Sequence, residues 1–82
     1  MITGSQIRAA RGALGWSGAE LANIGGVSLK TVTNIEAYAG LPEARVSTLK
    51  KLKHALEAAG IEFIGTPDDG PGIRVHAKTT KG

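Results

Sequence analysis

Cysteine is absent from this 82-residue sequence, and aromatic side chains are scarce, with one Trp, one Tyr and one Phe. Without cysteine, disulfide bonds, thiolate metal sites and a thiol nucleophile are excluded. No apolar run approaches the roughly 18 residues that cross a membrane, and the first residues lack the basic and then apolar segments of a signal peptide. We therefore expect a soluble, cytoplasmic protein with no membrane partner.

The chain is short and mildly basic. A single domain of this length buries only about two-thirds of its unfolded surface, so its core is thin and a partner would help to stabilise it. The net charge of +3 permits a nucleic acid as that partner, although charge alone is a weak argument.

A short helix is predicted between Ser17 and the glycine pair Gly25-Gly26. Ser17 and Glu20 have the spacing of a capping box, so the helix should begin at Gly18. The two glycines tolerate left-handed backbone angles and therefore indicate a helix end and a turn. An apolar stripe lies between these signals: Leu21, Ala22 and Ile24.

A second short helix, 29–37, should follow this turn. Ser28 is an N-cap candidate, and Val32 with Ile35 forms the narrow stripe that the helix would bury. The outward positions hold long or hydrogen-bonding side chains and no acidic one: Leu29, Lys30, Thr33 and Asn34. Such a face suits an anionic, hydrogen-bonding partner.

Two helices joined by a short glycine-containing turn are typical of helix-turn-helix proteins. The segment resembles the Xre/Cro-type helix-turn-helix family of bacterial and phage repressors at four places: Ala19-Glu20-Leu21-Ala22, Gly26-Val27-Ser28, Thr31-Val32 and Ile35-Glu36. The resemblance implies a mainly α, lambda-repressor-like bundle of about four helices. It also implies a dimeric transcriptional repressor that reads double-stranded DNA in the major groove with helix 29–37.

Base reading is expected from the outward side chains of that helix. Asn34 has the donor and acceptor that match adenine, and Lys30 can donate to guanine or to a phosphate. Leu29 can contact a thymine methyl, and Thr33 can reach a base or the sugar-phosphate backbone.

Phosphate contacts are expected at five further positions: Gly18, Ser28, Thr31, Tyr38 and Arg45. Ser28 and Thr31 can equally serve to cap the helix, and Tyr38 can instead pack across its loop. Two positions depart from the resemblance, because many family members have glutamine where this chain has Gly18, and a polar residue is common at Leu29.

A first helix, 4–14, is signalled by the capping-box spacing of Thr3 and Gln6. The resemblance implies that Arg11 on this helix forms a structural ion pair with Glu36, which leaves Arg8 as a candidate phosphate contact. Trp16, between the first two helices, is expected to complete the core.

A loop, 37–45, and a fourth helix, 46–59, are predicted next, with Ser47 as a possible N-cap. The period then changes from about 3.6 to 2, which indicates strands over 61–64 and 72–76 around a loop at 65–71. An isolated hairpin is marginal in water, so it should lie on the helices or pair with another chain.

We predict that the strands join those of a second subunit in a homodimer. The apolar side chains expected at this interface are Ile61, Phe63, Ile64, Ile73 and Val75. The chain then divides into a DNA-binding domain at 1–60, a dimerisation segment at 61–76 and a flexible tail at 77–82.

Neither catalysis nor a cofactor is expected. His54 and Glu57 share one helix but lack a third metal ligand nearby in sequence, and no nucleophile–base pair is visible. Two alternatives to the repressor remain open: an antitoxin-type protein that binds both its operator and a toxin, and a protein-interaction module without DNA activity.

Overall fold

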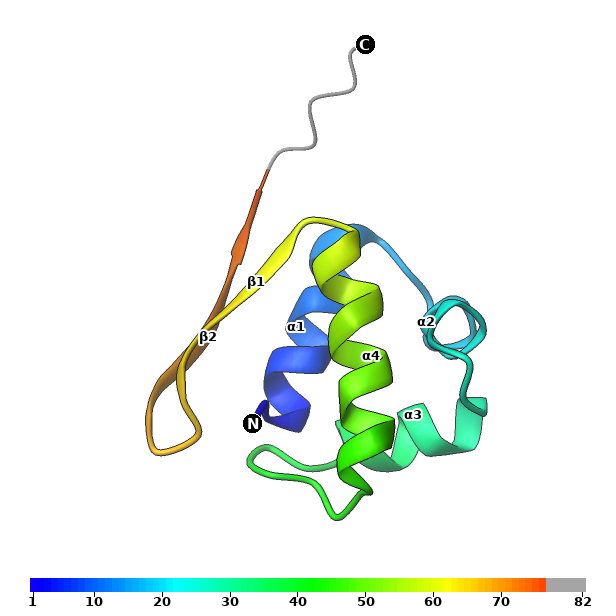
Figure 1. Ribbon diagram of the computed structural model, residues 1–82, viewed down its shortest axis with the longest axis horizontal. Coiled ribbons are helices and arrows are strands. Elements are labelled where there is room, and N and C mark those ends of the chain that lie inside the picture. Colours follow the sequence, from blue (N-terminus) through cyan, green and yellow to red (C-terminus); the bar gives the residue numbers. More distant parts are fainter. Residues whose placement is uncertain (77–82) are drawn as a thin grey trace, which may run out of the picture.

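The computed structural model describes residues 1–76, so the tail predicted at 77–82 lies outside the described residues. Four helices and a two-stranded sheet make up the described part, as predicted. Figure 1 shows α1 and α4 side by side, with α2 and α3 on one flank and the hairpin on the other. The elements are α1 (Gly4–Leu14), α2 (Gly18–Gly25), α3 (Leu29–Glu36), α4 (Val46–Ala58), β1 (Ile61–Thr66) and β2 (Asp69–Val75).

The local capping signals specify the starts of the first two helices. Both predicted capping boxes are formed, with the side chain of Thr3 accepting from the Gln6 N–H and that of Ser17 from the Glu20 N–H. The prediction for α4 was wrong in one respect: its N-cap is Arg45, which makes no side-chain capping bond, and not Ser47.

Side chains from all four helices and from the first strand meet in a core. Its largest fully buried members are Ile7, Leu21, Val32, Ile35, Leu52 and Leu56. Trp16 packs against the edge of this core and stays partly exposed. Ile24 was expected to be buried but is 52% exposed, because α2 packs through Leu21 and Ala22.

The two strands pair with each other in an antiparallel hairpin. Ile61 lies opposite Val75, and Phe63 lies opposite Ile73. Pairing extends beyond the predicted strands to Thr66 and Asp69, so the turn is shorter than the loop expected at 65–71. Gly65 and Gly70 have positive φ, and this backbone freedom accommodates the irregularity in register just before the turn.

The hairpin rests on the helices of its own chain. Ile61, which we expected at a dimer interface, is only 3% exposed and belongs to the core of this chain. Phe63 and Ile73 are half-buried against the same core. Packing within one chain therefore supplies the support that a two-stranded sheet needs.

Gln6 fastens the hairpin to α1. Its amide nitrogen donates to the main-chain oxygens of Ile64, at 3.1 Å, and Gly72, at 2.8 Å. Its amide oxygen accepts from the Thr3 N–H at 2.8 Å as part of the capping box. The Gln6 side chain is almost fully buried, so these hydrogen bonds satisfy polar groups that water does not reach.

The opposite face of the hairpin is charged. The Glu62 carboxylate lies 2.7 Å from His76 Nε2 and 3.2 Å from an Arg74 guanidinium nitrogen. The hydrogen bond with His76, followed by the charge of Arg74, lowers the pKa of Glu62. Opposite charges facing each other across the strands add modest support to this register.

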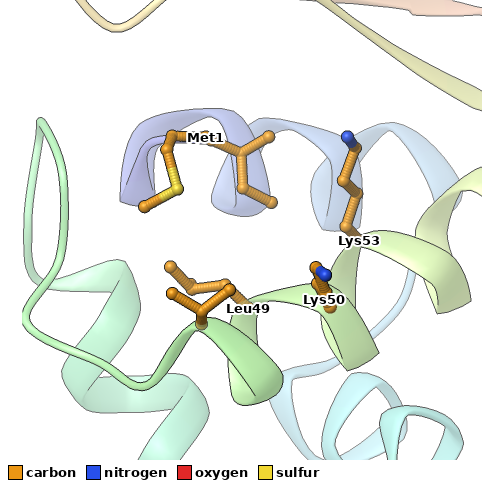
Figure 2. A pocket seen from close by; sticks show the side chains of 6 residues that line it. Met1, Leu49, Lys50 and Lys53 are labelled. Carbon is orange, nitrogen blue, oxygen red and sulfur yellow. The ribbon is translucent and has the colours of Figure 1, made fainter.

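A shallow apolar hollow lies between the first two residues and α4 (Figure 2). Met1 faces Leu49 across it, and Lys50 and Lys53 stand at one side. Val46 also lines the hollow and is 55% exposed. None of the helices within residues 1–76 is long and apolar enough to cross a membrane.

We predict that Gln6→Ala lowers the free energy of unfolding by about 1–3 kcal/mol for the buried groups that it leaves unpaired. Thr3→Ala is the matched control, because it removes the N-cap hydroxyl but keeps both bonds from Gln6 to the hairpin, and should cost about 1 kcal/mol. Urea denaturation measures both losses, and hydrogen exchange reports on the hairpin. Equal losses with a fully protected hairpin in both variants would show that Gln6 does not fasten it.

Candidate nucleic-acid interface

The C-terminal end of α3 is held from behind by an ion pair. Arg11 Nε donates to Glu36 Oε2 and Arg11 Nη2 to Glu36 Oε1, each at 2.8 Å. Arg11 Nη1 also donates to the main-chain oxygen of Trp16 at 3.0 Å, and the hydrogen bonds to Glu36 raise the pKa of Arg11. The structure thus contains the pair that the resemblance implied, and it ties α3 to both α1 and the start of α2.

Arg8, the candidate phosphate contact on α1, has a structural partner. Its guanidinium donates to the main-chain oxygen of Glu36 at 3.0 Å. A cation is favourable at this position, because the last carbonyls of a helix lack partners within the helix. Both arginines of α1 therefore act on the same end of α3.

The end of α3 also lies close to the start of α1. The Gly4 N–H donates to the Gly40 oxygen at 2.9 Å, which fixes the loop after α3. A side chain at Gly4 would overlap the main-chain oxygens of Ile35 and Tyr38, so this approach requires glycine.

The N-terminal end of α3 is capped by side chains that we had considered for phosphate binding. Ser28 Oγ accepts from the Thr31 N–H at 3.1 Å, and the two hydroxyl groups lie 2.9 Å apart. The sequence left both capping and phosphate binding open for Ser28 and Thr31. In the structure these residues form the N-terminal cap of α3.

The outward face of α3 is exposed. Leu29 is 50% exposed, and Lys30, Thr33 and Asn34 are also exposed. Lys30 forms no salt bridge with any residue in the range 1–76. The four positions predicted for base reading therefore lie together on one accessible surface, which we call the α3 face.

The two departures from the family pattern meet in space. A Cβ atom built on Gly18 would lie 3.2 Å from Leu29 Cδ1. The Leu29 side chain thus lies against the N-terminus of α2 and occupies space beside the position where a longer residue would begin. A side chain at Gly18 would therefore require the Leu29 side chain to shift by a few tenths of an ångström.

The loop between α3 and α4 borders the α3 face. Tyr38 and Arg45, both expected to bind phosphate, are exposed. The Tyr38 hydroxyl lies 3.5 Å from Glu43 Oε1. Two hollows open here: one is lined by Asn34, Ala37, Tyr38 and Glu43, and the other by Thr31, Asn34, Ile35, Glu43, Ala44, Arg45 and Thr48.

Glu43 is the residue of this region that sequence reasoning overlooked. It lines both hollows together with Asn34, one of the residues predicted to read bases. The available signal was its charge, because Glu43 is the only acidic residue in the loop 37–45. No group of three or more metal-ligating side chains occurs within residues 1–76.

Comparison with known families agrees with this geometry. The sequence model of a family described as helix-turn-helix matches residues 7–60, a stretch that includes most of α1 and all of α2, α3 and α4. The match ends immediately before the hairpin. A search of curated proteins found no match.

We predict that Arg11→Ala lowers the free energy of unfolding by about 3–5 kcal/mol, because it leaves the largely buried Glu36 carboxylate without its ion pair. Arg8→Ala, the matched control on the same helix, should cost only about 1 kcal/mol, because it removes a single hydrogen bond at a helix end. Urea denaturation measures both.

The double variant Arg11→Ala, Glu36→Ala should recover part of the loss of Arg11→Ala, since no unpaired carboxylate then remains buried. A loss in the double variant equal to the sum of the two single losses would contradict this coupling.

Proposed function

Because the chain belongs to the Xre/Cro-type helix-turn-helix family of DNA-binding regulators, we propose that it is a dimeric transcriptional repressor that reads its operator with α3. The observation that carries the proposal is the α3 face, an exposed and acid-free surface on a helix that is capped at its N-terminus and held by Arg11 at its C-terminus. Repression needs only occupancy of the operator, which this face can supply without a further surface that recruits other proteins.

In this proposal the side chains of the α3 face contact the bases. Asn34 forms paired hydrogen bonds with adenine, and Leu29 contacts a thymine methyl. Lys30 donates to guanine or to a phosphate, and Thr33 reaches a base or the sugar-phosphate backbone. The rigid attachment of α3 supports this assignment, because a reading helix must hold its register in the major groove.

Phosphate binding positions α3 on the duplex. Arg45 and Tyr38 contact the backbone from the loop beside the α3 face, and the Gly18 N–H does so from the N-terminus of α2. Ser28 and Thr31 contribute less than the sequence suggested, because their hydroxyl groups already bond to each other. This distribution of roles keeps sequence readout on α3.

Dimerisation occurs through the hairpin in this proposal. A helix-turn-helix monomer reads few base pairs, and two-fold dimers that bind half-sites one helical turn apart read enough for specificity. Within residues 1–76 the sheet has only these two strands, so the outer edge of each has no strand partner there, and Val75 is 52% exposed. Ile61 is excluded by its burial, which leaves four residues for the contact: Phe63, Ile64, Ile73 and Val75.

An antitoxin-type role is the second candidate. The hairpin lies outside the stretch that matches the family, and its exposed edge can bind a different protein in place of a second copy. The two candidates share DNA binding and differ in what occupies the hairpin. Copurification of a stoichiometric partner encoded by the adjacent gene would favour the antitoxin role, whereas the purified chain alone forming dimers would favour the repressor.

We predict that Asn34→Ala loses about 1–3 kcal/mol of binding free energy at one base pair only. Selection of the parent protein on random duplexes at a stated salt concentration should first yield a palindromic site. Fluorescence anisotropy on that site and its single-base variants then locates the loss. Equal binding of variant and parent to every duplex would refute base reading by Asn34.

Lys30→Ala should weaken binding and, if the ammonium group contacts a phosphate, lower the slope of log K against log salt by about 0.9. Lys53→Ala is the matched control, because it removes the same charge from α4, where Lys53 lies 4.0 Å from Glu57. A protein-interaction module without DNA activity would show no effect of Lys30→Ala on any measured property.

Val75→Asp should convert the dimer to a monomer, because it places a carboxylate in an apolar contact between subunits. Val46→Asp, in the hollow of Figure 2, makes the same change at an equally exposed apolar residue on another surface and should leave the dimer intact. Sedimentation velocity measures both. If Val46→Asp dissociates the dimer and Val75→Asp does not, the subunits meet at that hollow and not at the hairpin.

A further inference from the structure

Glu43 is an acidic side chain beside a surface that is otherwise suited to an anionic partner. It is exposed, and it lines both hollows between α3 and the following loop. Within residues 1–76 its carboxylate forms no salt bridge. Asn34 lines the same two hollows, so Glu43 accompanies a predicted base-reading side chain.

A structural role explains Glu43 poorly. Among residues 1–76, its side chain has a single hydrogen bond, from the Tyr38 hydroxyl, and at 3.5 Å that bond is long for an O–H donor. An exposed bond of this kind contributes little to stability. The carboxylate is also unfavourable near DNA, because it repels phosphates and weakens nonspecific binding.

We propose that Glu43 is a specificity-determining residue that accepts a hydrogen bond from the N4 amino group of a cytosine, next to the base read by Asn34. This inference rests on the proposed function, in which α3 enters the major groove. It assigns to the loop after α3 a reading role as well as the phosphate contacts of Tyr38 and Arg45.

The chemistry of a carboxylate explains this choice of base. An ionised carboxylate only accepts hydrogen bonds, and cytosine presents a donor in the major groove. Guanine presents O6 and N7 and thymine presents O4, all of which are acceptors that repel it. Adenine combines a donor with the acceptor N7, so it satisfies the carboxylate less well than cytosine does. Glu43 therefore favours one base and penalises the others.

The test compares full-length parent, Glu43→Gln and Tyr38→Phe. Glutamine keeps the size of the side chain and an oxygen that accepts from Tyr38, but it removes the charge. Tyr38→Phe removes the bond to Glu43 and keeps the carboxylate. Each protein is selected on random duplexes, and its affinity is then measured on the parent site, on its single-base variants and on an unrelated duplex, at one salt concentration.

For Glu43→Gln, we expect about a tenfold or greater loss of preference for cytosine at one position in each half-site, together with tighter binding to the unrelated duplex. Tyr38→Phe should weaken binding to every duplex to a similar extent, because it removes a phosphate contact, but it should retain the cytosine preference. The proposal is overturned if Glu43→Gln raises affinity equally for all duplexes, which would make Glu43 a source of repulsion only. It is also overturned if Tyr38→Phe abolishes the preference as fully as Glu43→Gln, which would make the loop conformation the cause.

Failure of this inference differs from failure of the proposed function. If the parent protein selects a palindrome and Glu43→Gln selects the same one, the proposed function stands and only the role of Glu43 is refuted. A parent protein that enriches no sequence refutes base reading altogether, and the role of Glu43 with it.

Discussion

The C-terminal end of α3 is held in place by one ion pair, between Arg11 of α1 and Glu36 of α3. The Arg11 guanidinium donates two hydrogen bonds to the Glu36 carboxylate and one to the main-chain oxygen of Trp16. It therefore links α1, α3 and the segment before α2. Arg8 adds a bond to the last carbonyl of α3. Val32 and Ile35 of this eight-residue helix are buried in the core and set which of its faces points outward. The polar contacts from α1 hold the C-terminal end of the helix, and with it the α3 face, in that orientation.

Sequence patterns predicted the helices well because the signals that start and end them are local. The capping boxes at Thr3 and Ser17 involve residues three apart, and both are formed. The features that the sequence did not predict involve residues far apart along the chain. Neither the bonds from Gln6 to the hairpin nor the burial of Ile61 has a local signal, because each joins segments that are remote along the chain. Ile24 was misplaced because periodicity identifies an apolar stripe but not how much of it a neighbouring helix covers.

The same distinction applies to the candidate interface. The exposed positions of α3 follow from its helical period, and the family resemblance adds Arg11 and Glu36. The contact between Gly18 and Leu29 could not be seen in the sequence, although each residue stood out separately as a departure from the family pattern. Glu43 went unnoticed because a loop has no periodicity from which to infer which side chains lie beside the helix. Interface residues on regular elements are thus predictable, and those contributed by loops require the structure.

The Gln6 side chain has a consequence for how the protein is made. Its bond to the Gly72 oxygen spans 66 residues, so the first turn of α1 obtains its full set of partners only after synthesis has passed Gly72. During synthesis the ribosome still covers the hairpin when the helix-turn-helix segment emerges. The nascent chain can form its helices at that stage, but their attachment to the hairpin waits until the hairpin has also emerged. A transcript truncated before the hairpin would yield a product without the bonds from Gln6 to the hairpin, and this product would be more susceptible to proteolysis.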